Sequence, residues 1–385
     1  MSNASPGPAP NPTPPPSLFA APPRPQPSGL LFSAIGIVVA ALVGLLVIGY
    51  IALALGFSAL VIGSLLALVP LAIVLLAVAW VDRWEPEPRW ALWFAFLWGA
   101  AVSVAIALLV DLSLQLLLAY TEPGGSPNEA LAAVVQAPIV EETAKGIGVL
   151  LIYAFSRSHF DGPVDGLVYA ATVAAGFAFT ENILYFGAAL AEGGGGELGA
   201  TFVVRGLFSP FAHVLFTACT GLLIGVGARR GGGAGVVGWF LLGLAGAVFL
   251  HAVWNGSLTF ADDAIGLYFT VQVPIFIGAV LLTLFLRFQE VRVTRARLSE
   301  YAAAGWFSRA EVEMLATPAG RRHARAWARS QTPPRTALMR RLIADATRLA
   351  FNRHALVTGR ADVRRLTDER VLLDAVTADR AALLR

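Results

Sequence analysis

The sequence predicts an all-α protein: a polytopic bundle of about eight transmembrane helices, followed by a small helical cytoplasmic region. Three observations support this fold class. Of the 385 residues, 57% are hydrophobic and only 14% are charged, so lipid rather than water must surround most of the chain. Apolar runs long enough to cross a bilayer recur between residues 30 and 287. Basic residues gather in alternate connections between these runs, as membrane topology requires.

Residues 1–28 precede the first apolar run. They are rich in proline and nearly uncharged, a composition that buries too little apolar surface to offset the entropy of ordering. The segment lacks the basic start, short apolar core and cleavage site of a secretory signal. We therefore expect a disordered cytoplasmic tail.

Eight apolar runs follow and define a membrane domain over residues 29–287. Backbone amides find no water in hydrocarbon, so spanning segments must be helices unless they close into a barrel, and the alternating pattern of a barrel is missing from this sequence. The expected spans are 30–54, 58–81, 90–119, 129–155, 163–187, 201–227, 235–258 and 265–287.

The charges of the connections predict the orientation. Connections after even-numbered spans carry arginines, whereas those after odd-numbered spans carry acids and no Lys or Arg. The positive-inside rule then places both termini in the cytoplasm of a multi-pass plasma-membrane protein. Arg205 is the exception, a few residues inside the sixth span, and we expect it to have an acidic partner or a water-filled cavity.

Residues 288–385 differ in composition from the membrane domain. Arg, Ala, Leu and acids recur at helical spacing, with a break at Pro333 and Pro334, which predicts a small helical cytoplasmic region that regulates or anchors the protein at anionic lipid. The pI of about 9.3 follows from these arginines, so nucleic acid is not an expected partner. The single cysteine, Cys219, is expected to pack in the core, and one cysteine permits no internal disulfide.

Four consecutive spans carry polar residues that are costly in lipid. They are Glu141, Glu142 and Lys145 in the fourth span, Glu181 and Asn182 in the fifth, Arg205 and His213 in the sixth, and His251 and Asn255 in the seventh. Each charged group at the bilayer centre costs about 2.5–3.5 kcal/mol on insertion scales. Taken singly, each has a structural explanation, as an ion pair or an interhelical hydrogen bond. Taken together, they are expected to meet in one polar, water-accessible cavity between the midplane and the outer face.

The spacing along each helix predicts which side chains share a face. Lys145 follows Glu141 by four residues and is expected to hold Glu141 by charge, while Glu142 points about a quarter-turn away. His251 and Asn255 are also four apart and project together.

Such a cavity suits two schemes of amide hydrolysis. In one, a desolvated carboxylate acts as general base and then as general acid on a water molecule, and His and Asn side chains stabilise the oxyanion. In the other, the same His and Glu set binds Zn²⁺ with an open position for water, with Glu181, His213 and His251 as candidate ligands. The sequence contains no H-E-x-x-H or G-x-S-x-G motif, so the better-known zinc and serine arrangements are not supported.

The ordered set of motifs resembles that of the PrsW family of intramembrane proteases, which is distantly related to the CAAX prenyl-protease type of glutamate-dependent intramembrane proteases. The resemblance is carried by Glu141-Glu142-x-x-Lys145, Phe177-x-x-x-Glu181-Asn182, His213 and His251-x-x-x-Asn255. The segment DRWEPEPR at 82–89 also resembles a loop of bacterial PrsW-like proteins. The resemblance covers residues 58–287.

This resemblance implies a role for each residue. Glu141 would activate the water, Glu142 and Lys145 would support it, and His213, His251 and Asn255 would position the water or hold the oxyanion. Glu181 stands where the CAAX relatives have His, and Arg205 and Asn182 would bind substrate or support the site. The implied partners are membrane lipid and a single-pass membrane protein, such as an anti-sigma factor, cleaved near the outer membrane boundary.

Two other functions fit intramembrane Glu and His. A proton-coupled transporter also uses such residues, but its fold should show an internal repeat, which this sequence lacks. A catalytically inactive membrane scaffold would tolerate loss of the two adjacent glutamates.

Overall fold

The computed structural model describes residues 27–121, 128–157, 160–230, 235–359 and 363–384, and every element in these ranges is a helix. The all-α prediction is therefore confirmed. The predicted disordered tail, residues 1–28, lies outside the described residues except for its last two positions. The first helices are α1 (Pro27–Leu55), α2 (Phe57–Val81), α3 (Arg89–Leu97) and α4 (Val104–Thr121), with a π-helical segment η1 (Trp98–Ser103) between α3 and α4.

The middle of the chain holds the helices that carry the predicted polar residues. They are α5 (Glu129–Leu131), η2 (Ala132–Gln136), α6 (Ala137–Phe155), α7 (Pro163–Phe202), η3 (Val203–Phe208), α8 (Ala212–Arg229) and α9 (Gly235–Phe260). The chain continues with α10 (Ala264–Leu267), η4 (Tyr268–Gln272), α11 (Val273–Ala303), α12 (Arg309–Ala316), α13 (Pro318–Ser330), α14 (Thr336–Val357) and α15 (Val363–Leu384).

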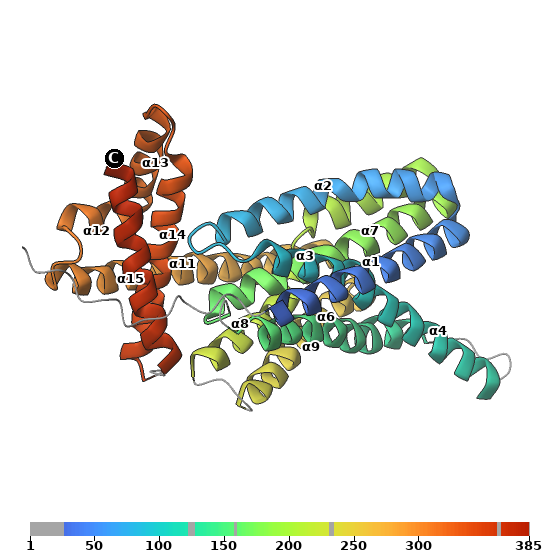
Figure 1. The fold of residues 1–385 in the computed structure, drawn as a ribbon. Coiled ribbons are helices and arrows are strands. Elements are labelled where there is room, and N and C mark those ends of the chain that lie inside the picture. The colour runs from blue at the N-terminus through green and yellow to red at the C-terminus, as the bar shows by residue number, and fades with distance from the viewer. Residues whose placement is uncertain (1–26, 122–127, 158–159, 231–234, 360–362, 385) are drawn as a thin grey trace, which may run out of the picture.

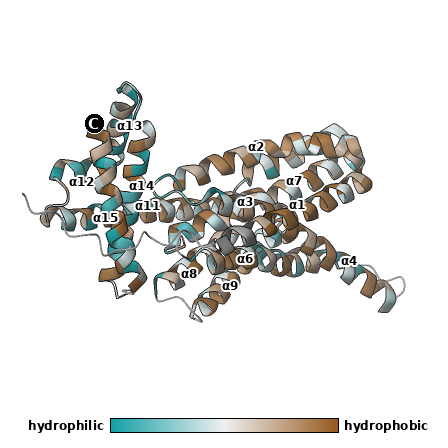
Figure 2. Ribbon diagram, in the orientation of Figure 1, coloured by the Kyte–Doolittle hydropathy of each residue, from teal (hydrophilic) through white to brown (hydrophobic). Residues whose placement is uncertain are grey.

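Among the described residues, six helical stretches are long and apolar enough to cross a membrane, and Figure 2 shows them as the brown part of the molecule. They are Ala34–Leu55, Phe57–Val81, Arg89–Thr121, Pro163–Arg229, Gly235–Phe260 and Ala264–Ala303. The predicted fourth span, α6, is not among them because Glu141, Glu142 and Lys145 make it polar. The predicted fifth and sixth spans lie together in the stretch Pro163–Arg229.

Helix α7 lies at the centre of the bundle, packed against α2, α3 and α8. Gly162 and Gly166 at its start face Gly225 and Gly221 of α8, so the two helices run antiparallel. A Cβ atom on Gly166 would lie 2.0 Å from the carbonyl oxygen of Gly221, which means that the two backbones touch. Small residues permit this close packing between helices in membranes.

The chain from α7 to α8 has two breaks, one inside α7 and one just before α8. Gly194 interrupts α7 with a φ of 68°, a left-handed conformation that favours glycine. The helix then resumes and continues through η3, and it turns again at residues 209–211, where Pro210 lies between η3 and α8. The turn at Pro210 places His213 in the first turn of α8.

The C-terminal region consists of the helices α12–α15, which stand across the end of the bundle (Figure 1) and carry much of the hydrophilic teal in Figure 2. They share a hydrophobic core with the end of α11, including Leu298, Leu315, Leu342 and Leu349. Helix α11 runs through the expected boundary at 287–288 without a break, because neither Gly nor Pro occurs there before Gly305.

The loop between α2 and α3 joins this region to the bundle through Trp84. The Trp84 Nε1 donates to Thr294 Oγ1 at 3.1 Å. The buried guanidinium of Arg321 lies 3.4 Å from the centre of the Trp84 ring, and its Nη1 donates to the Trp84 carbonyl oxygen at 2.9 Å. The C-terminal helices are thus attached to the membrane domain by a buried stacked pair.

Candidate active site

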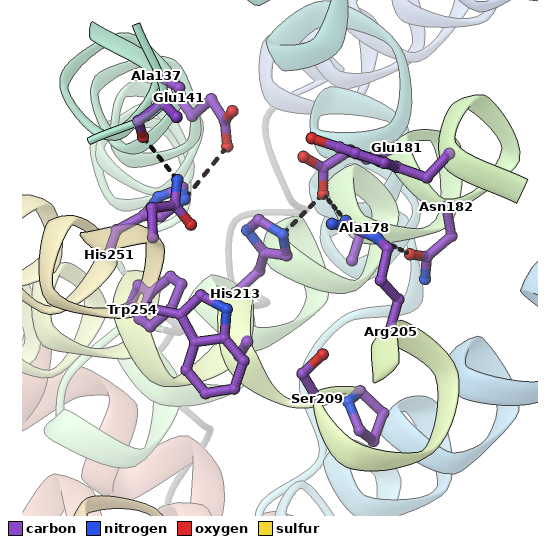
Figure 3. Close-up of a pocket in the computed structure, with 16 residues that line it drawn as sticks. Ala137, Glu141, Ala178, Glu181, Asn182, Arg205, Ser209, His213, His251 and Trp254 are labelled. Atoms are coloured by element: carbon purple, nitrogen blue, oxygen red, sulfur yellow. Dashed lines mark hydrogen bonds and ion pairs between the residues drawn. The ribbon is translucent and has the colours of Figure 1, made fainter. Parts of the chain in front are cut away.

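Seven of the nine predicted polar residues line one cavity of about 100 Å³ inside the bundle (Figure 3). Glu141 of α6, Glu181 of α7, His213 of α8, and His251 and Asn255 of α9 all line it. The prediction that the polar residues share one cavity is therefore confirmed for all of them except Glu142 and Lys145. Phe216 and Trp254 complete the wall between the two histidines and the η3 segment.

The two adjacent glutamates of α6 occupy different environments. Glu141 lines the cavity, whereas Glu142 and Lys145 are fully buried behind it. Lys145 Nζ lies 2.6 Å from Glu142 Oε1 and 3.5 Å from Glu141 Oε2. The expected ion pair between Lys145 and Glu141 is therefore present. Lys145 also pairs with Glu142, and more closely, because its flexible side chain reaches back over three residues.

Glu142 has further partners that fix its carboxylate. Thr217 Oγ1 donates to Glu142 Oε2 at 2.8 Å, and His251 Nδ1 lies 3.0 Å from Glu142 Oε1. An ionised carboxylate only accepts, so His251 carries its proton on Nδ1 and presents the lone pair of Nε2 to the cavity.

Glu141 is the carboxylate with unused hydrogen-bonding capacity. Its Oε2 atom is buried and has no hydrogen-bond partner among the described residues. The nearest opposite groups are Lys145 Nζ at 3.5 Å and His251 Nε2 at 4.0 Å. A buried polar atom left in this way needs a ligand such as water or a metal ion.

His213 connects the two sides of the cavity. Its Nε2 lies 2.8 Å from Glu181 Oε2, and its Nδ1 lies 3.2 Å from Lys145 Nζ. Because an ammonium only donates, His213 accepts at Nδ1 and donates from Nε2 to Glu181. The His213 and His251 rings stand edge to face, with centroids 5.4 Å apart.

Arg205 lies on the far side of the cavity, on η3. It donates to Glu181 and, through Nε, to Asn182 Oδ1 at 2.9 Å, and it stacks 3.8 Å from the centre of the Tyr185 ring. The expected acidic partner of Arg205 is therefore Glu181, and Asn182 supports the same cation (Figure 3).

Asn255 lies at the edge of the cavity. Its Nδ2 donates to the carbonyl oxygen of Ala133 at 2.8 Å, in the π-helical segment η2 that leads into α6. This hydrogen bond ties α9 to the backbone two turns before Glu141, and one amide proton of Asn255 stays available to the cavity.

Sequence reasoning did not find four residues of the site: Thr217, Phe216, Tyr185 and Trp254. The spacing of each from a predicted residue on the same helix indicates that it belongs to the site. Thr217 follows His213 by four residues and Tyr185 follows Glu181 by four, so each lies on the same helix face as its predicted neighbour. Phe216 and Trp254 each follow a predicted histidine by three. The Phe216 ring stacks on His251 with centroids 4.7 Å apart.

The residues that could hold a metal ion are Glu141, Glu142, His213 and His251, whose ligand atoms lie within 4.8 Å of one another. This set contains Glu141 and Glu142 in place of the expected Glu181, which instead binds Arg205 and His213. Glu141 Oε2 and His251 Nε2 are the two ligand atoms of this set that make no hydrogen bond to the described residues. The contact of His251 Nδ1 with Glu142 matches the carboxylate–histidine pairing usual around metals, so the donor set fits zinc.

A protein-family model described as PrsW family intramembrane metalloprotease matches residues 87–279, a range that contains every residue of this site. No solved structure matches this chain.

Three proteins named Protease PrsW are similar to this chain. That of Geobacillus kaustophilus (strain HTA426) is 33% identical over 144 residues, which are 37% of this chain and 57% of that protein. That of Clostridioides difficile (strain 630) is 32% identical over 165 residues, 42% and 63% of the two chains. That of Bacillus subtilis (strain 168) is 29% identical over 178 residues, 46% and 74% of the two chains. The alignments thus span less than two thirds of the first two relatives' length.

Proposed function

We propose, from the premise that this chain belongs to the PrsW family of intramembrane metalloproteases, that it is an endopeptidase that hydrolyses a peptide bond of a membrane-anchored protein. One observation carries the proposal. A buried carboxylate oxygen, Glu141 Oε2, has no hydrogen-bond partner among the described residues and lies 4.0 Å from the imidazole nitrogen His251 Nε2, in a cavity inside an apolar bundle.

Glu141 is the general base in this proposal. The cavity of about 100 Å³ exceeds the roughly 10–15 Å³ that one water needs. Glu141 accepts a proton from that water while the water oxygen attacks the scissile carbonyl carbon. It then delivers the proton to the leaving amine nitrogen, so one carboxylate serves as base and as acid.

Glu142 and Lys145 position the catalytic groups without touching the substrate. Lys145, Thr217 and His251 surround Glu142 and hold it as a carboxylate behind the cavity wall. Glu142 in turn fixes the tautomer and orientation of His251. The oxyanion of the tetrahedral intermediate is stabilised by donors at the cavity surface, Arg205 and the second amide proton of Asn255.

If zinc is bound, Glu141 and His251 would hold it, and His213 could join if its Nδ1 released Lys145. The metal would then polarise the carbonyl and acidify the water, and Glu141 would serve as a ligand in place of acting as the free base. A chelator-treated enzyme should then lose cleavage and regain it with Zn²⁺. Bound zinc, measured by atomic absorption, should fall in His251→Ala.

We further propose eight membrane spans with both termini in the cytoplasm. The six apolar stretches become eight when α6 is added and when Pro163–Arg229 is divided at its breaks into two antiparallel spans. The arginine-rich connections then all lie on one side. This orientation places the cavity in the outer half of the bilayer and cleavage near the outer boundary of a single-pass substrate.

The test compares Glu141→Gln with the wild type in proteoliposomes that contain a single-pass reporter. We expect cleavage to fall by about 10²–10⁴-fold, the usual contribution of a general base. Glu192→Gln is the matched control, because Glu192 is an exposed glutamate on α7 away from the cavity. Undiminished cleavage by Glu141→Gln would reject Glu141 as the general base. No cleavage by the wild type with any single-pass reporter would reject the protease and favour the transporter or the scaffold.

A further inference from the structure

A second, larger cavity opens beside the polar one. It is a groove of about 800 Å³ between α4, the segment from Asn128 to Glu141, and α7. Both cavities are lined by Glu141, Glu181, Tyr185, Ala133 and Ala137, so the groove leads directly to the free oxygen of Glu141. Its volume lies in the range of roughly 300–1,000 Å³ typical of ligand pockets, which suits a short stretch of polypeptide rather than a whole helix.

The outer wall of the groove is the second half of α4. This part of the helix diverges from the bundle in Figure 1, and residues 111–120 are exposed except for Leu118, which is half-buried. Its groove-facing side chains are mainly apolar, among them Leu114 and Leu117. An apolar segment in the bilayer can therefore reach the groove sideways, without passing through water.

The charges of the groove are of one sign. Four acids line it: Asp111, Glu129, Glu141 and Glu181. No Lys, Arg or His belongs to its lining in the part of the chain that the structure describes. A wall of this composition is complementary to a cation.

Asp111 and Glu129 are the two acids of the groove that the catalytic site does not use, and Asp111 lies within the apolar stretch Arg89–Thr121. Its carboxylate accepts from Gln115 Nε2 at 2.8 Å and from Gln136 Nε2 at 3.5 Å, and no basic side chain contacts it among the described residues. A carboxylate in a membrane span without a cation is costly and is retained for a function. Gln136 lies five residues before Glu141, about 7–8 Å along the helix axis.

We propose that this groove binds an extended stretch of the substrate's transmembrane segment, and that Asp111 selects substrates with a Lys or Arg two or three residues from the scissile bond. The proposal rests on the proposed protease function. The distance follows from the rise of about 3.3 Å per residue in an extended chain, which covers 7–8 Å in two to three residues. Extension is required because a peptide bond inside a helix keeps its carbonyl and amide hydrogen-bonded and unavailable for attack.

Docking is tested first without catalysis. A photo-crosslinking amino acid replaces Leu114, which faces the groove, in a Glu141→Gln background, and the reporter carries a Lys near its cleavage site. Leu116 is the matched control, since it is equally apolar, lies on the same helix, is 62% exposed and is not part of the groove. We expect at least fivefold more crosslinked reporter from position 114. Equal yields at both positions would overturn the docking site even if the enzyme cleaves.

Specificity is tested by exchanging charges. With a Lys reporter, Asp111→Asn should raise KM and lower kcat/KM about tenfold, with kcat little changed. A tenfold change lies between the effect of losing an exposed ion pair and the effect of losing a buried one. With a Leu reporter, the same substitution should have no effect, and Asp111→Lys should improve cleavage of a Glu reporter. An unchanged Lys-to-Leu preference in Asp111→Asn would refute the role of Asp111. Crosslinking at position 114 without any cleavage by the active enzyme would instead refute the protease proposal.

Discussion

Replacing Lys145 by Met should destabilise the protein strongly, although Lys145 does not line the cavity. Its ammonium is fully buried and lies 2.6 Å from Glu142, 3.2 Å from His213 and 3.5 Å from Glu141. Methionine retains most of the side-chain volume and leaves two buried carboxylates without their cation. Breaking a buried pair in this way typically costs about 3–5 kcal/mol. At about 2–4 °C per kcal/mol, the unfolding midpoint should fall by roughly 6–20 °C.

The double substitution Lys145→Met with Glu142→Gln provides the control. It removes both charges, so the penalty for an unpaired carboxylate disappears and at least half of the lost stability should return. Thermal unfolding of the purified wild type, both single variants and the double variant forms a double-mutant cycle with a large coupling energy. If the two substitutions change the unfolding free energy additively, or if Lys145→Met lowers it by less than about 1 kcal/mol, the ion pair of Lys145 and Glu142 does not stabilise the site.

Three further predictions concern regions outside the site. Arg321→Ala should lower the free energy of unfolding by about 2–4 kcal/mol, because it removes the stack on Trp84 and buried hydrogen bonds of a charged group. Limited proteolysis should then release the C-terminal helices. Arg322→Ala, at an exposed neighbouring position, should not make the protein more sensitive to the protease. Burial raises the pKa of Asp82 from 3.8 to about 6, so the folded protein holds this proton more tightly than the unfolded chain does. The stability should therefore fall as the pH rises from about 4 to 6 and then level off. In Asp82→Asn, the unfolding temperature should depend less on pH over this range. Gly166→Ala would place a Cβ 2.0 Å from a carbonyl oxygen of α8, and this overpacking should lower the unfolding free energy by about 1–3 kcal/mol or more.

Several parts of the site followed from spacing along single helices. The sequence places His251 and Asn255 on one face, and both line the cavity. It also requires a partner for Arg205, which is Glu181. In both cases the argument concerns the cost of a polar group in lipid or the pitch of one helix, and neither depends on how helices are arranged.

The parts that the sequence did not predict depend on contacts between helices. Which carboxylate Lys145 approaches depends on His251 and Thr217, which arrive from α9 and α8 to hold Glu142. The metal-binding set differs from the expected one for the same reason, since Arg205 bends back from η3 and occupies Glu181. Helix rotation and neighbour choice are decided by packing, and spacing along one chain segment does not encode them.

The glycine contact between α7 and α8 determines which part of the active site can move. Backbone lies on backbone there, so these two helices, with Glu181 and His213, form a single rigid unit. The glycines of α6 face side chains instead: Gly146 faces the Phe240 ring, and Gly148 faces the Trp98 ring. Rings can rotate where backbone cannot, so we expect any widening of the site to come from a movement of α6. The helix that supplies the proposed base is then also the helix that opens the path to it.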